Sequence, residues 1–285
     1  MKLLRVGPPG EEHPAVLDAA GGLRDLSAVV DDIDGAALGV GGLRRIAAAL
    51  ASDDLPALDA TGVRTGPPLA RPGKVVCIGL NYRDHAAETG AALPTEPVVF
   101  MKASNTVVGP DDEVFIPRGS GKTDWEVELA VVIGTRARYL DSAEDALACI
   151  AGYAVANDVS EREFQLERGG QWDKGKSCET FNPLGPWLVT ADEVADPQRL
   201  GLRLWVNGRL RQDGTTADMV FGVGELVAYL SRFMVLDPGD VINTGTPAGV
   251  ALGQPEPRPY LRPGDLVELE IDGLGRQRQR LVAAP

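Results

Sequence analysis

The sequence has few histidines, few cysteines and no excess of positive charge, and each shortage excludes a class of protein. Two histidines among 285 residues are too few for a histidine-rich metal site. Three cysteines cannot all pair, and none forms a C-x-x-C, so we expect no disulfide framework and a reducing, cytoplasmic setting. The net charge is −13, whereas nucleic-acid binding requires clustered Lys and Arg. We therefore expect no nucleic-acid partner.

Long hydrophobic runs and the common nucleotide motifs are also missing. The N-terminal residues lack the apolar stretch of a signal peptide, and no apolar run approaches the ~20 residues of a membrane helix, so no membrane partner is expected. The absence of G-x-x-x-x-G-K-[ST], G-x-G-x-x-G and G-x-S-x-G disfavours phosphate-loop, dinucleotide and standard serine-hydrolase enzymes. The acidity also argues, more weakly, against an anionic substrate.

Glycine and proline are abundant, with 34 and 21 residues distributed along the chain as turn punctuation. This pattern is typical of many short strands joined by turns. We predict a mainly β, α+β protein in three parts. They are a small N-terminal α/β domain at residues 1–64, a Pro/Gly-rich linker at 65–73 and a β-rich catalytic domain at 74–285.

Apolar periodicity predicts the individual elements. Short apolar or alternating runs predict strands at 3–6, 15–18, 23–26, 75–78, 98–101, 125–133, 150–155 and 202–206. Helical spacing predicts helices at 36–51, capped by Asp34, and at 141–149 and 224–234.

Acidic residues lie in and beside two of the predicted strands. Glu126 and Glu128 alternate with apolar residues, so a strand directs both to one face. Two adjacent carboxylates repel unless they are solvated or bridged by a cation, and carboxylate oxygens are the ligands that Mg²⁺ prefers. The alternative is a solvated sheet face, but the residues that follow are continuously apolar. Asp158 ends the next apolar strand and could supply a third ligand, or could cap a helix.

A histidine and a glutamate form a second candidate pair. His85 and Glu88 are three residues apart and are therefore neighbours on a helix face. A carboxylate beside an imidazole increases its basicity, which suits a general base that acts on water. Surface helices also carry such pairs without a catalytic role.

Two glycine-containing segments could contact an anion. Residues 169–177 combine glycines with Lys174 and Lys176, as in a mobile anion-binding loop or an ordinary exposed loop. Residues 243–249 follow a strand and offer small hydroxyl residues and backbone N–H groups, as in a ligand-binding turn or simply a tight turn.

The order of these segments resembles the fumarylacetoacetate hydrolase family over residues 74–282. The resemblance is carried by Asn-Tyr with His-x-x-Glu, then Glu-x-Glu, Asp158, Arg-x-x-Gln, Lys-Ser and Thr-Gly-Thr-Pro. Residues 1–70 and 167–190 resemble the branch that includes hydrolases of 2,4-diketo-3-deoxy sugar acids of the rhamnonate and fuconate type. The resemblance implies a mixed β-sandwich roll around a metal site, and a homodimer.

The resemblance also implies a role for each candidate residue. Mg²⁺ or Mn²⁺ would be bound by Glu126, Glu128 and Asp158. Water would be activated by His85 and Glu88 on a short segment that orders as a lid, and the oxyanion stabilised by Lys176. The substrate would be contacted by Arg162, Gln165, Tyr82, Thr246 and the Gly245 backbone. One departure concerns Leu80, because some small acylpyruvases of the family carry Arg at that place.

The implied reaction is metal-dependent cleavage of the C3–C4 bond of a 2,4-diketo acid, giving pyruvate and a small hydroxy acid. Water deprotonated by His85 attacks the C4 carbonyl, and the pyruvate fragment leaves as an enolate. The substrate is a small anionic oxo-acid, and the divalent cation reconciles it with the acidic chain. The alternatives are oxaloacetate decarboxylation, isomerisation or hydration of 2-oxo-dienoic acids, and non-catalytic binding of metal and oxo-acid.

Overall fold

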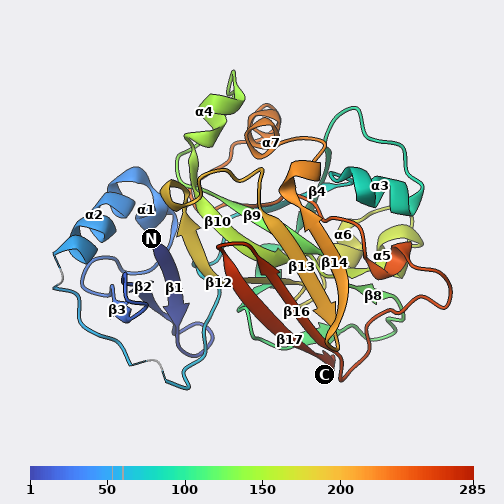
Figure 1. The fold of residues 1–285 in the computed structure, drawn as a ribbon, viewed down its shortest axis with the longest axis horizontal. Coiled ribbons are helices and arrows are strands. Elements are labelled where there is room, and N and C mark those ends of the chain that lie inside the picture. The colour runs from blue at the N-terminus through green and yellow to red at the C-terminus, as the bar shows by residue number, and fades with distance from the viewer. Residues whose placement is uncertain (53, 60) are drawn as a thin grey trace.

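The apolar runs of the sequence form two β-sheets that pack face to face, with helices outside them (Figure 1). The structure is a computed structural model and describes residues 1–52, 54–59 and 61–285. The fold is mainly β with mixed sheets, as predicted.

The larger sheet carries the predicted acidic strands at its centre. β9 and β10 are buried along their whole lengths, because both faces of this sheet are covered. Over the described residues the sheet has ten strands, which are, in spatial order, β3 (Leu23–Asp25), β2 (His13–Leu17), β1 (Lys2–Val6), β12 (Asn182–Thr190), β10 (Ile150–Asn157), β9 (Val127–Ile133), β15 (Val241–Asn243), β4 (Val75–Gly79) and β5 (Val98–Lys102), with β6 (Val107–Val108) beside β12.

The smaller sheet covers one face of the larger one. Its strands β13 and β16 alternate between buried and partly exposed residues, so only one face packs on the core. In that core, Leu204 and Leu269 share a hydrophobic cluster with Leu129 and Val131 of β9. Among the described residues this sheet has five strands, in the order β14 (Arg209–Thr215), β13 (Gly201–Val206), β16 (Leu266–Ile271), β17 (Gly275–Ala283) and β7 (Val114–Ile116). A separate pair is formed by β8 (Thr123–Asp124) and β11 (Ser160–Glu161).

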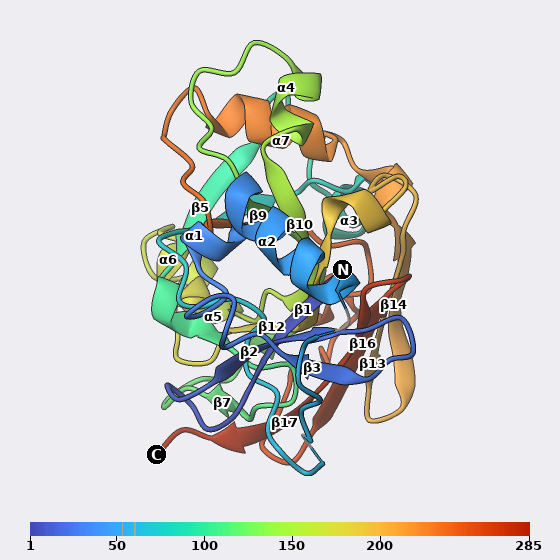
Figure 2. The same ribbon diagram turned by 90° about the vertical axis from the view of Figure 1, so that its left-hand side faces the viewer.

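Helices α1 and α2 cover the opposite face of the larger sheet, so the core has a helix–sheet–sheet arrangement (Figure 2). Leu38 and Ile46 of these helices share a second cluster with Val132 and Ala154 of the sheet. The α-helices are α1 (Gly35–Leu38), α2 (Val40–Ala51), α3 (Arg83–Thr89), α4 (Ala143–Leu147), α5 (Arg162–Leu166), α6 (Asp173–Lys176) and α7 (Val223–Leu230). Short 3-10 turns are η1 (Ser104–Thr106), η2 (Ala191–Glu193), η3 (Thr216–Asp218) and η4 (Ala251–Gly253). Of the helices in the described ranges, none is long and apolar enough to cross a membrane.

Several predicted boundaries differ from the structure, such as those of the helix expected at 141–149, which spans Ala143–Leu147. Three differences matter for the rest of the fold. The helix expected at 36–51 is two helices, because Gly39 takes an extended conformation with φ −65° and ψ 160°; the predicted cap Asp34 does accept hydrogen bonds at the start of α1. The helix expected at 224–234 ends at Leu230. The strand expected from residue 125 begins at Val127, so Glu126 precedes it.

The first 64 residues contribute to the same sheet as the rest of the chain, because β1 pairs with β12. The predicted linker packs closely: the Gly66 amide donates to the Arg5 carbonyl at 2.8 Å, and Leu69 is fully buried. The division into units at residues 65–73 stays a prediction.

Candidate active site

Three buried carboxylates meet where the start of β9 lies beside the end of β10. The two strands are antiparallel, with Glu128 opposite Ala156, so Glu126 and Glu128 lie close to Asp158. One carboxylate oxygen of each residue lies within 4.8 Å of the others, and the three residues are at most 5% exposed. The predicted metal ligands are therefore brought together. The predicted alternatives for these acids do not fit, because none is solvated and Glu161, not Asp158, caps α5.

Two buried lysines contact this acidic triad. Lys176 Nζ lies 2.7 Å from Glu126 Oε2 and 3.0 Å from Asp158 Oδ2. Lys102 Nζ donates to Asp158 Oδ1 and, at 3.0 Å, to the Val159 carbonyl. Burying charges in this way is tolerated only where each has a partner, so the cluster is held as a unit.

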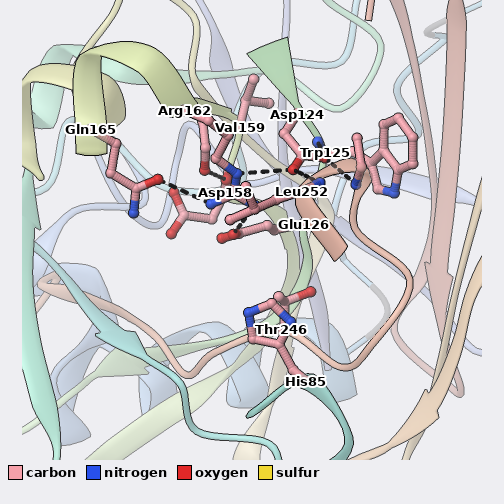
Figure 3. A network of polar contacts seen from close by, with 12 residues as sticks. His85, Asp124, Trp125, Glu126, Asp158, Val159, Arg162, Gln165, Thr246 and Leu252 are labelled. Carbon is pink, nitrogen blue, oxygen red and sulfur yellow. Dashed lines mark hydrogen bonds and ion pairs between the residues drawn. The ribbon is translucent and has the colours of Figure 1, made fainter. Parts of the chain in front are cut away.

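Arg162 connects the triad to a fourth acid (Figure 3). Its Nη2 lies 2.7 Å from Glu126 Oε1 and its Nε 2.9 Å from Asp124 Oδ2. Asp124 also accepts the Ala251 and Leu252 amides at 2.7 and 2.9 Å. Asp124 thereby fixes η4 to the guanidinium that orients Glu126.

The surroundings of the two glutamates shift their pKa values in opposite directions. Burial opposes ionisation of Glu126, but Lys176 and Arg162 outweigh it and lower its pKa to about 2. Burial raises the pKa of Glu128 well above its usual range, and the nearby charges of Asp158 and Glu126 add to the effect. Glu128 accepts the Gly245 amide at 2.8 Å, and no lysine or arginine of the described residues pairs with it. Three oxygen donors, one of them without a cationic partner, fit Mg²⁺ or Mn²⁺.

The histidine–glutamate pair lies on α3, as its spacing predicts. His85 Nδ1 is 3.3 Å from Glu88 Oε1, and the Gly249 amide donates to Glu88 Oε2 at 2.8 Å. A proton on Nδ1 that is donated to Glu88 leaves Nε2 free to act as a base. His85 lines the cavity, and in Figure 3 it lies with Thr246 across from Glu126 and Arg162.

The segment predicted to act as a lid is held by hydrogen bonds at its N-terminal end. Before α3, the Asn81 amide donates to the Thr244 carbonyl at 2.8 Å and to the Phe221 carbonyl at 3.1 Å. Within α3, Asp84 accepts the Ala248 amide at 3.1 Å. The start of the helix is thus held against the loop after β15.

A cavity of about 190 Å³ joins Glu126 and Glu128 of the triad to the histidine, whereas Asp158 lies behind them and does not line it. The predicted residues that line it are His85, Glu126, Glu128, Arg162, Gln165, Lys176 and Thr246. Gln165 accepts from Arg162 Nη1 at 3.0 Å, and no hydrogen bond within the described chain uses its Nε2. The amide nitrogen is therefore free to donate to a ligand.

Two predicted substrate contacts are placed differently. Tyr82 packs in the core between the sheets and does not line the cavity; burial raises the pKa of its phenol well above its usual range. Gly245 uses its amide on Glu128, so it orients a predicted metal ligand. Thr246 does line the cavity, with its hydroxyl donating to the Val127 carbonyl at 2.9 Å and accepting from Gln212 Nε2 at 2.8 Å.

The sequence reasoning missed three residues of this site. Asp124 lies two positions before Glu126, so the alternating acids included a signal for it. Lys102 directly follows the strand predicted at 98–101 and Gln212 lies among charged residues, and neither has a local pattern that indicates a partner far away in sequence.

A β-sandwich that carries a histidine–glutamate pair beside an internal triad of carboxylates, which could hold a metal ion, defines a class of enzyme fold. Residues 74–282 match the protein family described as the fumarylacetoacetate (FAA) hydrolase C-terminal family. This chain belongs to the fumarylacetoacetate hydrolase family.

Relatives match over the whole length. A Burkholderia multivorans protein is 56% identical over 100% of both chains. It is named as a hydrolase, without a substrate. The Exiguobacterium antarcticum fumarylacetoacetate hydrolase structure is 35% identical with a TM-score of 0.86, covering 100% of both chains.

Two further structures are named for different reactions. A Sphingobium maleylpyruvate hydrolase in complex with manganese(II) and pyruvate is 30% identical, covers 100% of both chains and has a TM-score of 0.81. A Mycobacterium marinum 2-hydroxyhepta-2,4-diene-1,7-dioate isomerase is 32% identical with a TM-score of 0.76, covering 99% of this chain and 98% of that one.

Proposed function

We propose that this protein is a divalent-metal-dependent hydrolase that cleaves the C3–C4 bond of an acylpyruvate, a 2,4-diketo acid, to give pyruvate and a second acid. The observation that carries the proposal is the cavity that Glu126 and Glu128 of the acidic triad share with His85. The Sphingobium maleylpyruvate hydrolase, whose structure holds manganese and pyruvate, supports the same kind of substrate head group.

Mg²⁺ or Mn²⁺ bound by Glu126, Glu128 and Asp158 would supply the positive charge that polarises the oxygens of an oxo-acid. His85 Nε2 accepts a proton from water, and Glu88 stabilises the resulting imidazolium. Since the Gly249 amide holds Glu88, the pair keeps its geometry while the charge develops. The water oxygen attacks C4.

Lys176 provides the charge that the tetrahedral oxyanion requires. Its ammonium is buried, and Asp158 and Glu126 raise its pKa against the opposing effect of burial, so it stays protonated. A preorganised donor of this kind contributes about 3 kcal/mol to transition-state stabilisation. When the C3–C4 bond breaks, the bonding pair passes to the pyruvate fragment, which takes up a proton at C3.

A pyruvate-release screen over acylpyruvates and 2,4-diketo-3-deoxy sugar acids with Mg²⁺ tests this function. We expect pyruvate and an equal amount of the second acid from at least one substrate, abolished by EDTA. His85→Ala should lower kcat by roughly 100-fold or more, because the general base is lost. No cleavage of any substrate at saturating metal would sink the proposal.

Isomerisation of a 2-oxo-dienoic acid is the second candidate, since the Mycobacterium marinum structure carries that name. It needs proton transfer between carbons but no attacking water, so it gives an isomer and no pyruvate. Decarboxylation of oxaloacetate also needs no water, and His85→Ala would then retain full activity. Product analysis separates the three reactions.

A further inference from the structure

Beyond its charged residues, the active-site cavity has an apolar wall. This wall is formed by Leu80, Ala91, Phe100, Leu166, Trp172 and Leu252. The residues come from the end of β4, the segment after α3, β5, the end of α5, the residue before α6, and η4.

The apolar wall begins directly beside the proposed reaction centre. Lys176 Nζ lies 4.9 Å from the centroid of the Phe100 ring. The Trp172 ring packs edge-on against Phe100, with 5.4 Å between centroids. Trp172 also reaches β4, because a Cβ placed on Gly79 would lie only 2.6 Å from its Cζ3 atom. A substrate tail that leaves the reacting carbon on this side meets aromatic rings.

The cationic groups of the cavity are already engaged. Among the described residues, the lysine and arginine side chains that line it are Lys176 and Arg162, and both are ion-paired with carboxylates of the triad and Asp124. Thr89 has its hydroxyl bonded to the carbonyls of its own helix at 2.9 and 3.3 Å. Lys176 keeps one N–H for the proposed oxyanion and Gln165 Nε2 is free, so a second carboxylate or a row of hydroxyls on the tail finds few partners.

The backbone conformation of Leu80, one residue of the apolar wall, is unusual. It has a φ of 54°, a left-handed conformation that non-glycine residues rarely adopt. The surrounding structure thus holds an apolar side chain at this point of the cavity, where a cation could otherwise meet an anionic tail.

We propose that the substrate is an acylpyruvate with an apolar, alkyl or aryl, acyl tail, and that Leu80 and Trp172 determine this preference. The proposal rests on the proposed function, because it concerns the other end of the same substrate. Each methylene buried on such a wall improves binding roughly fourfold. A buried hydroxyl without a partner weakens binding at least roughly fivefold, and an unpaired carboxylate weakens it more. Sugar acids and dicarboxylic tails are therefore disfavoured.

The decisive experiment measures binding by calorimetry with Mg²⁺ and two 2-oxo acids that the proposed reaction does not cleave. 2-Oxohexanoate and 2-oxoadipate share the same head and chain length, and differ in a terminal methyl or carboxylate. We expect 2-oxohexanoate to bind at least tenfold more tightly. Equal binding, or tighter binding of 2-oxoadipate, overturns the apolar-tail proposal, whatever the outcome of the pyruvate-release screen.

Two variants locate the preference. Leu80→Arg should weaken 2-oxohexanoate and strengthen 2-oxoadipate, because it adds a cation to the wall without branching at Cβ. Leu210→Arg is the matched control. Leu210 is 47% exposed on β14, so this substitution adds the same charge away from the wall. Trp172→Ala should weaken 2-oxohexanoate roughly tenfold and leave 2-oxoadipate unchanged. If both variants shift the two ligands equally, the wall does not select the tail.

Discussion

At the scale of the residue, two glutamates that are two positions apart have opposite electrostatic environments. Glu126 has cations on both carboxylate oxygens, at 2.7 Å each, whereas Glu128 has a backbone amide and two like-charged neighbours. A strand would give these residues similar surroundings on one face, but Glu126 lies before β9. Their contributions to stability should therefore differ in sign.

Replacing each glutamate with glutamine tests this difference. Glu126→Gln leaves Lys176 and Arg162 short of a partner and should destabilise the metal-free protein by about 3–5 kcal/mol at pH 8. Glu128→Gln removes an unfavourable buried charge and should stabilise the metal-free protein at the same pH. Urea unfolding in EDTA measures both, and equal losses in the two variants would contradict the account.

The pH dependence follows from the direction of each shift. Glu128 has a raised folded-state pKa, so its contribution is fully present below the unfolded pKa and is lost as pH rises through the folded pKa. The advantage of Glu128→Gln should thus shrink as pH is lowered from 8 toward 5. Glu126 contributes above its unfolded pKa, and that contribution is lost as pH falls from about 4.5 toward about 2.

How much of the site the sequence could show depends on where each partner lies. The acids and the histidine pair follow local periodicities, so their spacing indicated them. Lys102 at the end of β5 contacts Asp158, 56 positions away and just beyond β10, although β9, β15 and β4 lie between these two strands in the sheet. That proximity is a property of tertiary structure and has no local pattern.

At the scale of the element, helix α3, which carries the proposed general base, packs against the turn η4. A Cβ on Gly253 of η4 would lie 2.2 Å from Cγ and Cδ of Glu88. The glycine is needed here for close approach, because its φ is not in the left-handed region. The position of Glu88 against His85 is therefore set from outside the helix.

Gly253→Ala should push Glu88 away from His85 and lower kcat by about tenfold, with little change in KM or in the urea midpoint. This loss of kcat is smaller than the one expected for His85→Ala, because Glu88 is displaced whereas His85→Ala removes the general base. Gly41→Ala on α2 is the control, since an added Cβ meets nothing within 4 Å. An unchanged kcat in Gly253→Ala would show that the pair needs no such positioning.

Element prediction succeeded where burial pattern and backbone preference agree. β10 was predicted from a continuous apolar run and is buried throughout. The helix at 36–51 was predicted as one because its apolar spacing continues across Gly39, where the backbone becomes extended. Periodicity reports which residues are buried, and it does not report a change of backbone direction between them.

At the scale of the whole molecule, the candidate metal site joins elements that are distant in the chain. Strands β9 and β10, helices α5 and α6 and strand β5 all contribute a charged residue to the cluster or lie directly beside one. A cation bound there should stabilise the entire fold. The order of the strands was not predictable from their sequences. β15 pairs with both β9 and β4, which are distant from it in the chain, and this pairing depends on the tertiary fold.

Saturating Mg²⁺ should accordingly raise the melting temperature. At a concentration 100 times the dissociation constant, binding adds about 2.7 kcal/mol of stability, or about 5 °C for a chain of this size. Glu128→Gln should lose most of this increase while remaining folded. A wild-type melting temperature that is the same in Mg²⁺ and EDTA would contradict a metal site at the triad.

The most direct test of the proposed hydrolysis is to follow the water oxygen. Acylpyruvates with alkyl tails are incubated with the protein and Mg²⁺ in H₂¹⁸O, and the products are analysed by mass spectrometry with brief sampling. We expect one ¹⁸O in the released acyl acid, formed in equal amount to pyruvate, and no release in EDTA or with His85→Ala. Pyruvate formed without ¹⁸O in the acyl acid, or no cleavage, would contradict the proposed hydrolysis.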